Sequence, residues 1–377
     1  MRAWLTISLL AACSFPHGTA SSRDSDGGGD DDDAMAMGSD AGSIDARIDG
    51  MATTLRAKTI TVTATIGSTL QDFPMWFTVT DADLAARARL DGTDIFFTTT
   101  TGAPLDYQIQ RWTKATGRLD AWVRVPALQT NTAIQVRYGD VAVAAGPDAP
   151  GTFTGYAAVW HLEDALNNNT IVDATGQRNG TAAMLQPSDQ KAAQLGGGLD
   201  FSGGNDQITF TNPITGSGAH TISLWVNQRT TATNDALIVL GNGATNKARW
   251  FHSRYNTATI AVGFYANDYA NPNEDIQGDG WTLLHWVYEG ANRMTRIYRD
   301  GALVAGPFQH GSGVDTEGSG GTIGNAQAAF GMNMGGTAML DEVRIIGSAR
   351  SADWIAAEAL DQKTPASFYS VGAEQIP

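Results

Sequence analysis

The fold class is decided by the stretch Thr59-Ile60-Thr61-Val62-Thr63-Ala64-Thr65-Ile66. Apolar residues occupy every second position, and threonine occupies every position between them. Side chains of a β-strand point alternately to opposite faces, so this stretch has one apolar face and one polar face. The pattern predicts a strand with one face in a core and the other toward solvent.

Similar short runs continue toward the C-terminus. We expect further strands at 75–79, 94–97, 121–125, 133–138, 206–210, 221–227, 259–265, 283–288, 294–299 and 340–346, and one short helical patch at 81–89. The 43 glycines, against 12 prolines, supply many turns between them. A joint rich in glycine, proline and alanine at 144–151 marks a boundary. The sequence therefore predicts an all-β protein with two β-sandwich domains, residues 55–145 and 151–377.

Four motifs of the first domain point to one family. They are Asp91-Gly92-Thr93-Asp94-Ile95-Phe96-Phe97, Pro104-Leu105-Asp106-Tyr107, Ala121-Trp122-Val123-Arg124-Val125-Pro126 and Tyr138-Gly139-Asp140. Residues 55–145 resemble a family of bacterial surface domains of unknown function, the 2341-type, also found fused or adjacent to MotA/TolQ/ExbB-type proton-channel proteins. The resemblance implies no chemistry. Trp76, Trp112 and Trp122 either line a ligand surface or fill the sandwich core.

A longer succession of motifs lies in the second domain. It comprises Ala158-Val159-Trp160-His161-Leu162, Gly198-Leu199-Asp200-Phe201-Ser202-Gly203, Thr221-Ile222-Ser223-Leu224-Trp225-Val226, Trp281 with His285, Tyr298-Arg299-Asp300-Gly301, Leu340-Asp341-Glu342-Val343-Arg344-Ile345 and Ser351-Ala352-Asp353-Trp354-Ile355-Ala356. In this order, the motifs resemble a laminin-G-like, concanavalin A-type jelly roll over about 151–373. The resemblance implies two layers of antiparallel strands, a frequent structural calcium ion, and ligand recognition by loops or a concave face.

Two aspartates are carried over from this resemblance as calcium ligands. Asp341 stands at the start of a late strand. Asp173 lies in the loop Asp173-Ala174-Thr175-Gly176, whose backbone carbonyls would complete an oxygen shell. The alternative is that Asp173 caps its own turn and Asp341 pairs with a nearby arginine. A structural calcium ion is thus the one cofactor that we expect.

Sugar binding needs a flat, exposed aromatic side chain beside polar groups that bond to hydroxyls. Trp250, His252 and Arg254 occupy alternate positions of one run. In the next run, Tyr265 and Tyr269 do not fall on the alternate positions that the apolar residues occupy. These five residues are the candidate ligand-binding set. The alternative is that they are structural, because exposed aromatic residues are common in β-sandwiches.

The N-terminus resembles a lipoprotein signal peptide, residues 1–12. Met1-Arg2 is a short basic start, and the apolar run at 3–10 falls short of the ~20 residues that span a bilayer. Leu10-Ala11-Ala12-Cys13 looks like a bacterial lipobox, which implies that Cys13 becomes a lipidated N-terminus. Ser14 in the next position implies the outer membrane. Two or more acyl chains hold a protein stably to the lipid bilayer. An ordinary signal peptide that is cut elsewhere is the alternative.

Residues 13–54 are predicted to form a disordered acidic tether. Large apolar residues are almost absent from 21–50, which holds nine aspartates and two arginines. Such a segment cannot bury enough apolar area to offset its ordering entropy. Calcium binding by the aspartate run is the alternative to a simple spacer. The whole chain has a net charge of −15 and a pI near 4.6, which argues against nucleic acid as a partner.

Familiar catalytic motifs are missing from the sequence. There is no paired-carboxylate strand as in jelly-roll glucanases, no zinc-binding helix, no serine nucleophile elbow and no phosphate-binding glycine loop. The six histidines lack ligand spacing, and His161 and His285 are expected on strands as core or edge residues. We therefore expect a non-catalytic, envelope-anchored module that binds a glycan or a surface protein. The alternatives are a component of an envelope complex, associated with an ExbB/TolQ-type proton channel for example, and an unrecognised glycan hydrolase.

Overall fold

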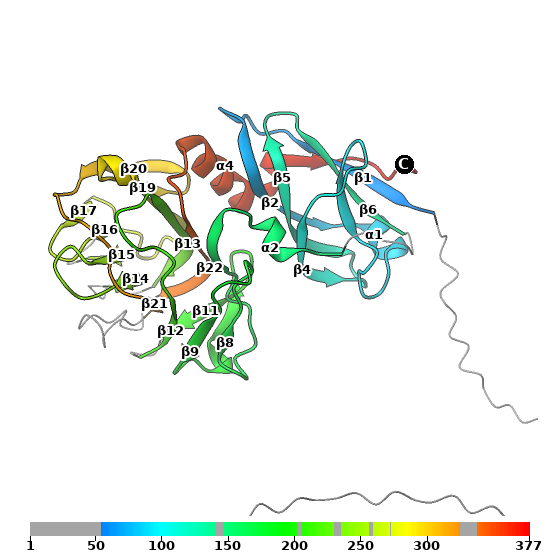
Figure 1. Cartoon of the computed structure of the whole chain (residues 1–377). Coiled ribbons are helices and arrows are strands. Elements are labelled where there is room, and N and C mark those ends of the chain that lie inside the picture. Colours follow the sequence, from blue (N-terminus) through cyan, green and yellow to red (C-terminus); the bar gives the residue numbers. More distant parts are fainter. Residues whose placement is uncertain are drawn as a thin grey trace, which may run out of the picture. The chain divides into compact units, whose positions relative to one another are not determined.

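Four antiparallel sheets make up most of the described chain (Figure 1). The computed structural model describes residues 54–139, 146–202, 205–229, 235–255, 259–271, 273–324 and 338–377, and residues 51–377 belong to one unit. The predicted signal peptide, Cys13 and nearly all of the predicted tether lie outside the described residues. No helix in the described ranges is long and apolar enough to cross a membrane.

The first β body, residues 56–138 together with 369–371, has two sheets around a shared core. One sheet has the order β23-β1-β6-β3, and the other has the order β2-β5-β4. The elements are β1 (Arg56–Val62), β2 (Leu70–Thr80), α1 (Ala82–Arg87), β3 (Phe96–Thr99), β4 (Tyr107–Thr113), β5 (Arg118–Leu128), β6 (Ala133–Tyr138) and β23 (Tyr369–Val371). Phe77 of one sheet packs edge-on against Phe97 of the other, with ring centroids 5.6 Å apart. Helix α1 occupies the expected helical patch.

The alternating stretch at 59–66 behaves as its pattern predicts, but its strand is shorter. Ile60, Val62 and Ala64 are buried, while Thr63 and Thr65 are exposed. Strand β1 ends at Val62, because the next two N–H groups leave the sheet and donate to the carbonyl of Phe368 at 2.9 and 3.0 Å. The C-terminal segment therefore determines where this strand stops.

The second β body, residues 156–346, consists of two larger sheets. One has the order β10-β11-β22-β13-β18-β19-β20 with β7 paired to β22, and the other has the order β17-β16-β15-β14-β21-β12-β9-β8. The strands are β7 (Tyr156–Trp160), β8 (Thr170–Ile171), β9 (Gly180–Ala183), β10 (Gln190–Ala193), β11 (Gly196–Phe201), β12 (Gln207–Thr211), β13 (His220–Gln228), β14 (Asp235–Gly241), β15 (Ala248–Arg254), β16 (Ile260–Gly263), β17 (Asp268–Asn271), β18 (Trp281–Tyr288), β19 (Met294–Arg299), β20 (Ala302–Gln309), β21 (Gly320–Gly324) and β22 (Ala338–Ile346). Short helical turns are α2 (Ala149–Thr152), η1 (Pro187–Asp189) and η2 (Gly290–Asn292).

Apolar side chains from both large sheets meet in one core. Phe251 of one sheet packs against Trp286 of the other with ring centroids 5.5 Å apart, and Leu224 and Ile345 are fully buried in the same core. The prediction of an all-β protein with two sandwiches is confirmed. Twelve of the described strands were not predicted, among them β14, whose short continuous apolar run does not show which secondary structure it forms.

The C-terminal residues connect the two β bodies. Helix α4 (Ala352–Lys363) begins at Ser351, whose side chain accepts from the N–H of Trp354, and it leads through α5 (Pro365–Phe368) into β23. Strand β23 pairs antiparallel with β1 in the first body, with Ile60 opposite Val371. The ring of Trp354 lies 5.0 Å from that of Phe73 on β2. Residues that belong to the second sequence segment, 151–377, thus complete the first sheet.

The hydroxyl of Tyr369 provides a first test of this connection. It accepts from the N–H of Thr78 at 2.8 Å and donates to the carbonyl of Thr78 at 3.1 Å, in a partly buried position. Tyr369→Phe leaves both backbone groups without this partner, so we expect the free energy of unfolding in urea to fall by about 1–3 kcal/mol. Ser370→Ala, at an exposed position on the same strand, should change it by less than about 0.5 kcal/mol. Equal effects of the two substitutions would contradict the role given to the hydroxyl.

A buried carboxyl on α4 provides a second test. Asp361 accepts from the N–H of Trp76 at 2.6 Å, and burial raises the pKa of its carboxyl well above the usual value. Because folding raises the pKa of Asp361, its ionised carboxylate destabilises the fold above that pKa. This destabilisation decreases as the pH falls toward the pKa that the carboxyl has in the unfolded chain. Asparagine resembles the protonated carboxyl, so Asp361→Asn should gain stability relative to the parent as the pH rises from 4 to 8.

The comparison is made by urea unfolding at several pH values. Asp353→Asn serves as the control, because Asp353 lies in the first turn of the same helix and bonds to Ser68 at an exposed contact. Loss of a negative charge there weakens the helix at neutral pH, so this variant should not gain stability. A pH-independent difference between the Asp361→Asn variant and the parent would refute the assignment.

Candidate functional site

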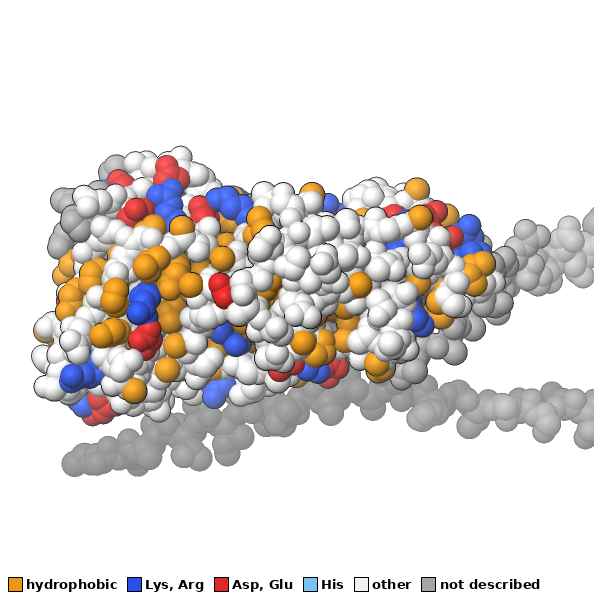
Figure 2. Space-filling view, turned by 90° about the horizontal axis from the view of Figure 1, so that it is seen from above, with side chains coloured by type: hydrophobic (Ala, Val, Ile, Leu, Met, Phe, Trp, Pro, Cys, Tyr) orange, Lys and Arg blue, Asp and Glu red, His pale blue; other side chains and the backbone are white. Residues whose placement is uncertain are grey.

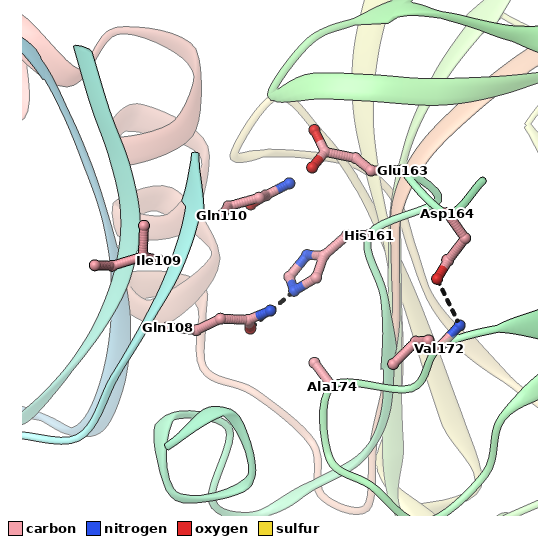
Figure 3. A pocket seen from close by; sticks show the side chains of 8 residues that line it. All are labelled: Gln108, Ile109, Gln110, His161, Glu163, Asp164, Val172 and Ala174. Carbon is pink, nitrogen blue, oxygen red and sulfur yellow. Dashed lines mark hydrogen bonds between the residues drawn. The ribbon is translucent and has the colours of Figure 1, made fainter. Parts of the chain in front are cut away.

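A polar pocket of about 300 Å³ lies where the two β bodies meet (Figure 3). Gln108, Ile109 and Gln110 enter it from β4 of the first body. The remaining lining residues follow β7 and β8 of the second body, and they are His161, Glu163, Asp164, Val172 and Ala174. The pocket thus presents two amides, one imidazole and two carboxyl groups beside the apolar side chains of Val172 and Ala174, whereas the side chain of Ile109 packs against the core of the first body.

His161 connects the two walls of the pocket. Its Nε2 lies 3.0 Å from the side-chain oxygen of Gln108 in the first body, and its Nδ1 lies 2.7 Å from Oε1 of Glu342 in the second. The next residue, Leu162, is fully buried with φ of 62°. Non-glycine residues adopt this left-handed region at a cost of about 1–3 kcal/mol, often at functional sites.

Burial makes both pocket carboxyls weaker acids. It raises the pKa of Glu163, even though the N–H of Gly197 donates to its Oε1 at 2.6 Å and favours the ionised form. It also raises the pKa of Asp164, whose Oδ1 accepts from the N–H of Val172 at 3.1 Å. These groups are therefore suited to hydrogen bonds with hydroxyl groups as well as to ionic contacts.

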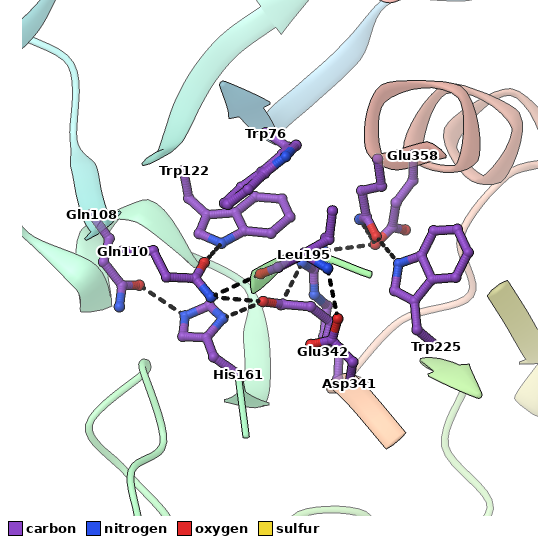
Figure 4. A network of polar contacts seen from close by, with 12 residues as sticks. Trp76, Gln108, Gln110, Trp122, His161, Leu195, Trp225, Asp341, Glu342 and Glu358 are labelled. Atoms are coloured by element: carbon purple, nitrogen blue, oxygen red, sulfur yellow. Dashed lines mark hydrogen bonds and ion pairs between the residues drawn. The ribbon is translucent and has the colours of Figure 1, made fainter. Parts of the chain in front are cut away.

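A buried charged network supports the pocket from behind (Figure 4). Glu342 pairs with Arg344 at 2.8 Å, Arg344 pairs with Glu358 of α4 at 2.8 Å, and Glu358 lies 3.1 Å from His285. The guanidinium of Arg344 lies 4.2 Å above the ring of Trp122 from the first body. A single cation therefore joins β22, α4 and β5.

The network remains ionised although water is excluded. Burial alone would raise the pKa of Glu342 and Glu358, but their hydrogen-bonded neighbours and the charge of Arg344 outweigh it. His161 and Arg344 hold the pKa of Glu342 below its usual value, and His285 and Arg344 lower that of Glu358 to about 2. The two carboxylates in turn raise the pKa of Arg344 against the effect of burial. Paired charges and hydrogen bonds are the conditions under which buried ions are tolerated.

A bulge in β22 brings Glu342 into this network. Ser223 of β13 pairs with Arg344 and Trp225 pairs with Asp341, so two residues of β22 oppose Leu224. Glu342 also has a φ of 52°. Bulges re-aim side chains and are frequent beside functional sites. Here the irregularity brings a carboxylate within reach of His161.

The two aspartates predicted as calcium ligands are both buried and take up hydrogen bonds. Asp173 accepts from its own turn and from β7, with donors on Val159, Thr175, Gln177 and Arg178. Asp341 accepts from the N–H of Leu195 at 2.8 Å, and burial and nearby Glu342 raise its pKa well above the usual value. In the described ranges, no group of three or more His, Cys, Asp or Glu side chains is arranged to hold a metal ion. Calcium binding stays a prediction.

The five candidate sugar-binding residues lie outside the lining of the pocket. Trp250, His252 and Arg254 are buried on β15, at 4, 1 and 4% exposure. Tyr265 is half-buried and stacks on Trp250 with ring centroids 5.3 Å apart, and Tyr269 stacks on Phe308 at 4.5 Å. A sugar would reach Trp250, His252 and Arg254 only through a face of the sheet that is closed in this structure.

Sequence reasoning did not identify most of the pocket. Gln108 and Gln110 alternate on one strand, which is the only local signal for a polar face, and nothing in the sequence shows that a second body covers that face. Glu163 and Asp164 follow the Ala158–Leu162 motif without a spacing typical of catalysis. Trp76 and Trp122, for which two roles were open, are core residues with ring centroids 4.7 Å apart. Trp112 is partly exposed and donates to the carbonyl of Arg89.

The chain is distantly similar to several solved structures. The binding domain of a paraclostridial mosquitocidal protein is 13% identical with a TM-score of 0.39, covering 54% of this chain and 51% of that one, so about half of its length is matched. Domain 4 of an extracellular arabinanase of family GH43 from Geobacillus stearothermophilus, in complex with arabinotriose, is 16% identical with a TM-score of 0.43 (54% of this chain, 98% of that one). Trypanosoma rangeli sialidase is 12% identical with a TM-score of 0.40 (63% and 42%). Similarity at this level says nothing about shared ligands.

Family models match two segments of the sequence. Residues 91–167 match a domain of unknown function (DUF2341), and residues 202–356 match the concanavalin A-like lectin/glucanases superfamily through a laminin G-type model. No curated protein matches the chain. The chain therefore contains a DUF2341-type domain followed by a concanavalin A-like domain of the laminin G type.

Proposed function

We propose that this chain is a non-catalytic glycan-binding lipoprotein of the cell envelope and that the pocket between the β bodies holds the glycan. The observation that supports the ligand class is the composition of the pocket. Gln108, Gln110, His161 and the two carboxyls offer both donors and acceptors, as sugar hydroxyls require, and Val172 and Ala174 offer apolar contacts for ring C–H groups. The concanavalin A-like domain belongs to a superfamily named for lectins and glucanases.

The pocket favours binding over hydrolysis. A glycoside hydrolase needs one carboxyl that stays protonated and a second that stays ionised, which requires environments that shift their pKa values apart. Burial shifts the pKa of Glu163 and that of Asp164 in the same direction, upward. Glu342, whose pKa is lowered, is buried behind His161 and does not line the pocket. The direction of these shifts therefore supports binding over hydrolysis.

The envelope part of the proposal rests on the N-terminal sequence. Lipidation at Cys13 would anchor the chain in the outer membrane, and the acidic segment at 13–54 would hold the binding unit away from the lipid surface. A partner in solution or on a neighbouring surface would then meet the pocket without contacting the bilayer.

Filling the pocket tests the binding proposal. Val172 is 51% exposed at the pocket wall, so Val172→Trp adds bulk there without changing the core. On a glycan array, the unit 51–377 should bind a defined set of glycans, and Val172→Trp should weaken that binding by about tenfold or more, since one blocked contact region removes over ~1.4 kcal/mol. Leu303→Trp is the matched control, because Leu303 is 50% exposed on β20 and lies outside the pocket lining.

The array is run with calcium and with a chelator. Absence of a glycan signal in both conditions sinks the proposal, and binding to a purified ExbB/TolQ-type subunit instead would favour the role in an envelope complex. Equal loss of binding in both tryptophan variants would place the ligand elsewhere. Release of shorter saccharides by the parent chain would identify a hydrolase. A fall in thermal stability on chelation would support the calcium prediction, because an ion that binds only the folded state stabilises it.

Metabolic labelling tests the anchor. Cells that express the full chain are grown with a palmitate analogue, and the chain should incorporate label and fractionate with outer membranes. Cys13→Ser removes the sulfur that would be acylated, so labelling should disappear completely while the chain is still produced. Label retained by this variant would refute lipidation at Cys13.

A further inference from the structure

A second pocket of about 210 Å³ lies beside the first, and Glu163 lines both. Its other lining residues come from β4, β10, β11 and the segment after β7, and they are Arg111, Leu162, Gln190, Lys191, Gly197 and Gly198. On β4, Arg111 directly follows Gln110 of the first pocket. The two pockets are therefore neighbours along the same line between the β bodies.

The second pocket differs from the first in charge, because two cations face it. Arg111 is about half exposed and its ion pairs are long, 3.8 Å to Asp120 and 4.0 Å to Glu163. Asp120 already accepts from Arg118 at 2.8 Å. Lys191 is exposed and forms no ion pair with any described residue. Both cations thus retain donors that a ligand can use.

This concentration of positive charge is local. The chain as a whole carries a net charge of −15, and Figure 2 shows a face on which basic and acidic side chains are interspersed among hydrophobic and uncharged ones. Glu163, whose Oε1 lies 4.0 Å from Arg111, is the one acidic side chain among the described residues that line the second pocket. An anion in the second pocket would raise the pKa of its carboxyl, which burial already raises.

Gly197 and Gly198 line the second pocket, and a third glycine, Gly196, directly precedes them. A Cβ atom on Gly196 would lie 2.0 Å from Oε1 of Glu163 and 3.2 Å from Nη2 of Arg111. A Cβ atom on Gly198 would lie 2.6 Å from the carbonyl oxygen of Leu340. Only residues without side chains let the backbone approach this closely. The pocket and the position of Arg111 beside Glu163 both depend on them.

We propose that the two pockets are adjacent subsites for an acidic glycan, with an uncharged ring in the first and the carboxylate of the next sugar between Arg111 and Lys191 in the second. The inference rests on the proposed glycan-binding function and specifies its ligand class. A planar guanidinium can bind a carboxylate through two parallel hydrogen bonds, while the ammonium group of lysine adds a point charge. The amides and carboxyls of the first pocket would fix the register of the neighbouring ring through its hydroxyls.

The test compares two saccharides that differ in charge and by one methyl group on each sugar. A hexamer of galacturonic acid and its fully methyl-esterified form are titrated calorimetrically into the unit 51–377. The acid should bind about tenfold more tightly or better, because charge-assisted hydrogen bonds are stronger than neutral ones. Raising the salt concentration should weaken binding of the acid and leave binding of the ester nearly unchanged.

Substitutions assign the preference to the second pocket. Arg111→Gln and Lys191→Gln should each reduce the ratio of the two affinities severalfold, and the double variant should abolish it while the ester still binds. Lys363→Gln is the matched control, since Lys363 lies outside both pockets and pairs with Asp300. It should leave the ratio unchanged.

The outcomes separate this inference from the proposed function. Equal affinity for acid and ester, with binding still lost in Val172→Trp, would overturn the acidic-glycan inference and leave glycan binding intact. A preference that survives the double variant would also overturn it. Tight binding of a sulfated hexamer but not of the carboxylated one would overturn the carboxylate assignment. Absence of binding to every saccharide would overturn the proposed function itself.

Discussion

The guanidinium of Arg344 determines how the two β bodies fit together. It lies between the carboxylates of Glu342 and Glu358 and above the ring of Trp122, so it contacts a strand of the second body, the C-terminal helix and a strand of the first body at once. Burying ions is costly, and a buried cation that loses one partner is strongly destabilising. Few relative placements of the two bodies are therefore energetically favourable, since all three contacts must be made together. Such a constraint favours one relative placement of the two bodies over neighbouring ones that would satisfy apolar packing equally well.

The geometry of the candidate site follows from the contacts of Arg344. His161 bonds to Glu342 on one side and to Gln108 on the other, so the charged network extends directly into the pocket wall. A ligand in this position would meet side chains whose orientation is already determined by buried partners, and little entropy would be lost in ordering them. The bulge at Glu342 and the left-handed backbone of Leu162 are local costs that the surrounding packing supports. Their presence beside one pocket makes it the strongest candidate for function in the described residues.

The sequence predicts the layers of this protein better than its site. Alternation at 59–66 and the later runs predict eleven of the twenty-three strands in the described ranges, because half-buried faces follow directly from the side-chain period. The same reasoning does not predict strand β15, because all seven of its residues are buried and the strand has no solvent-exposed face. This is why Trp250, His252 and Arg254 resemble an exposed set in the sequence and are packed in the structure. The pocket combines Gln108 and Gln110 with residues some fifty positions later, and the pairing of strand β23 with β1 that helps to hold these parts together has no local signature.

Strand β23 also has a consequence for how the chain acquires its structure. Tyr369 bonds to Thr78, 291 positions earlier, and β1 receives its outer neighbour only from residues close to the C-terminus. During synthesis, the N-terminal strands emerge long before their final partner. Until then, β1 is an open sheet edge that can pair with other chains. The first body is therefore the earliest part of the unit to appear and the last to be completed, and protection by a chaperone would matter most in that interval.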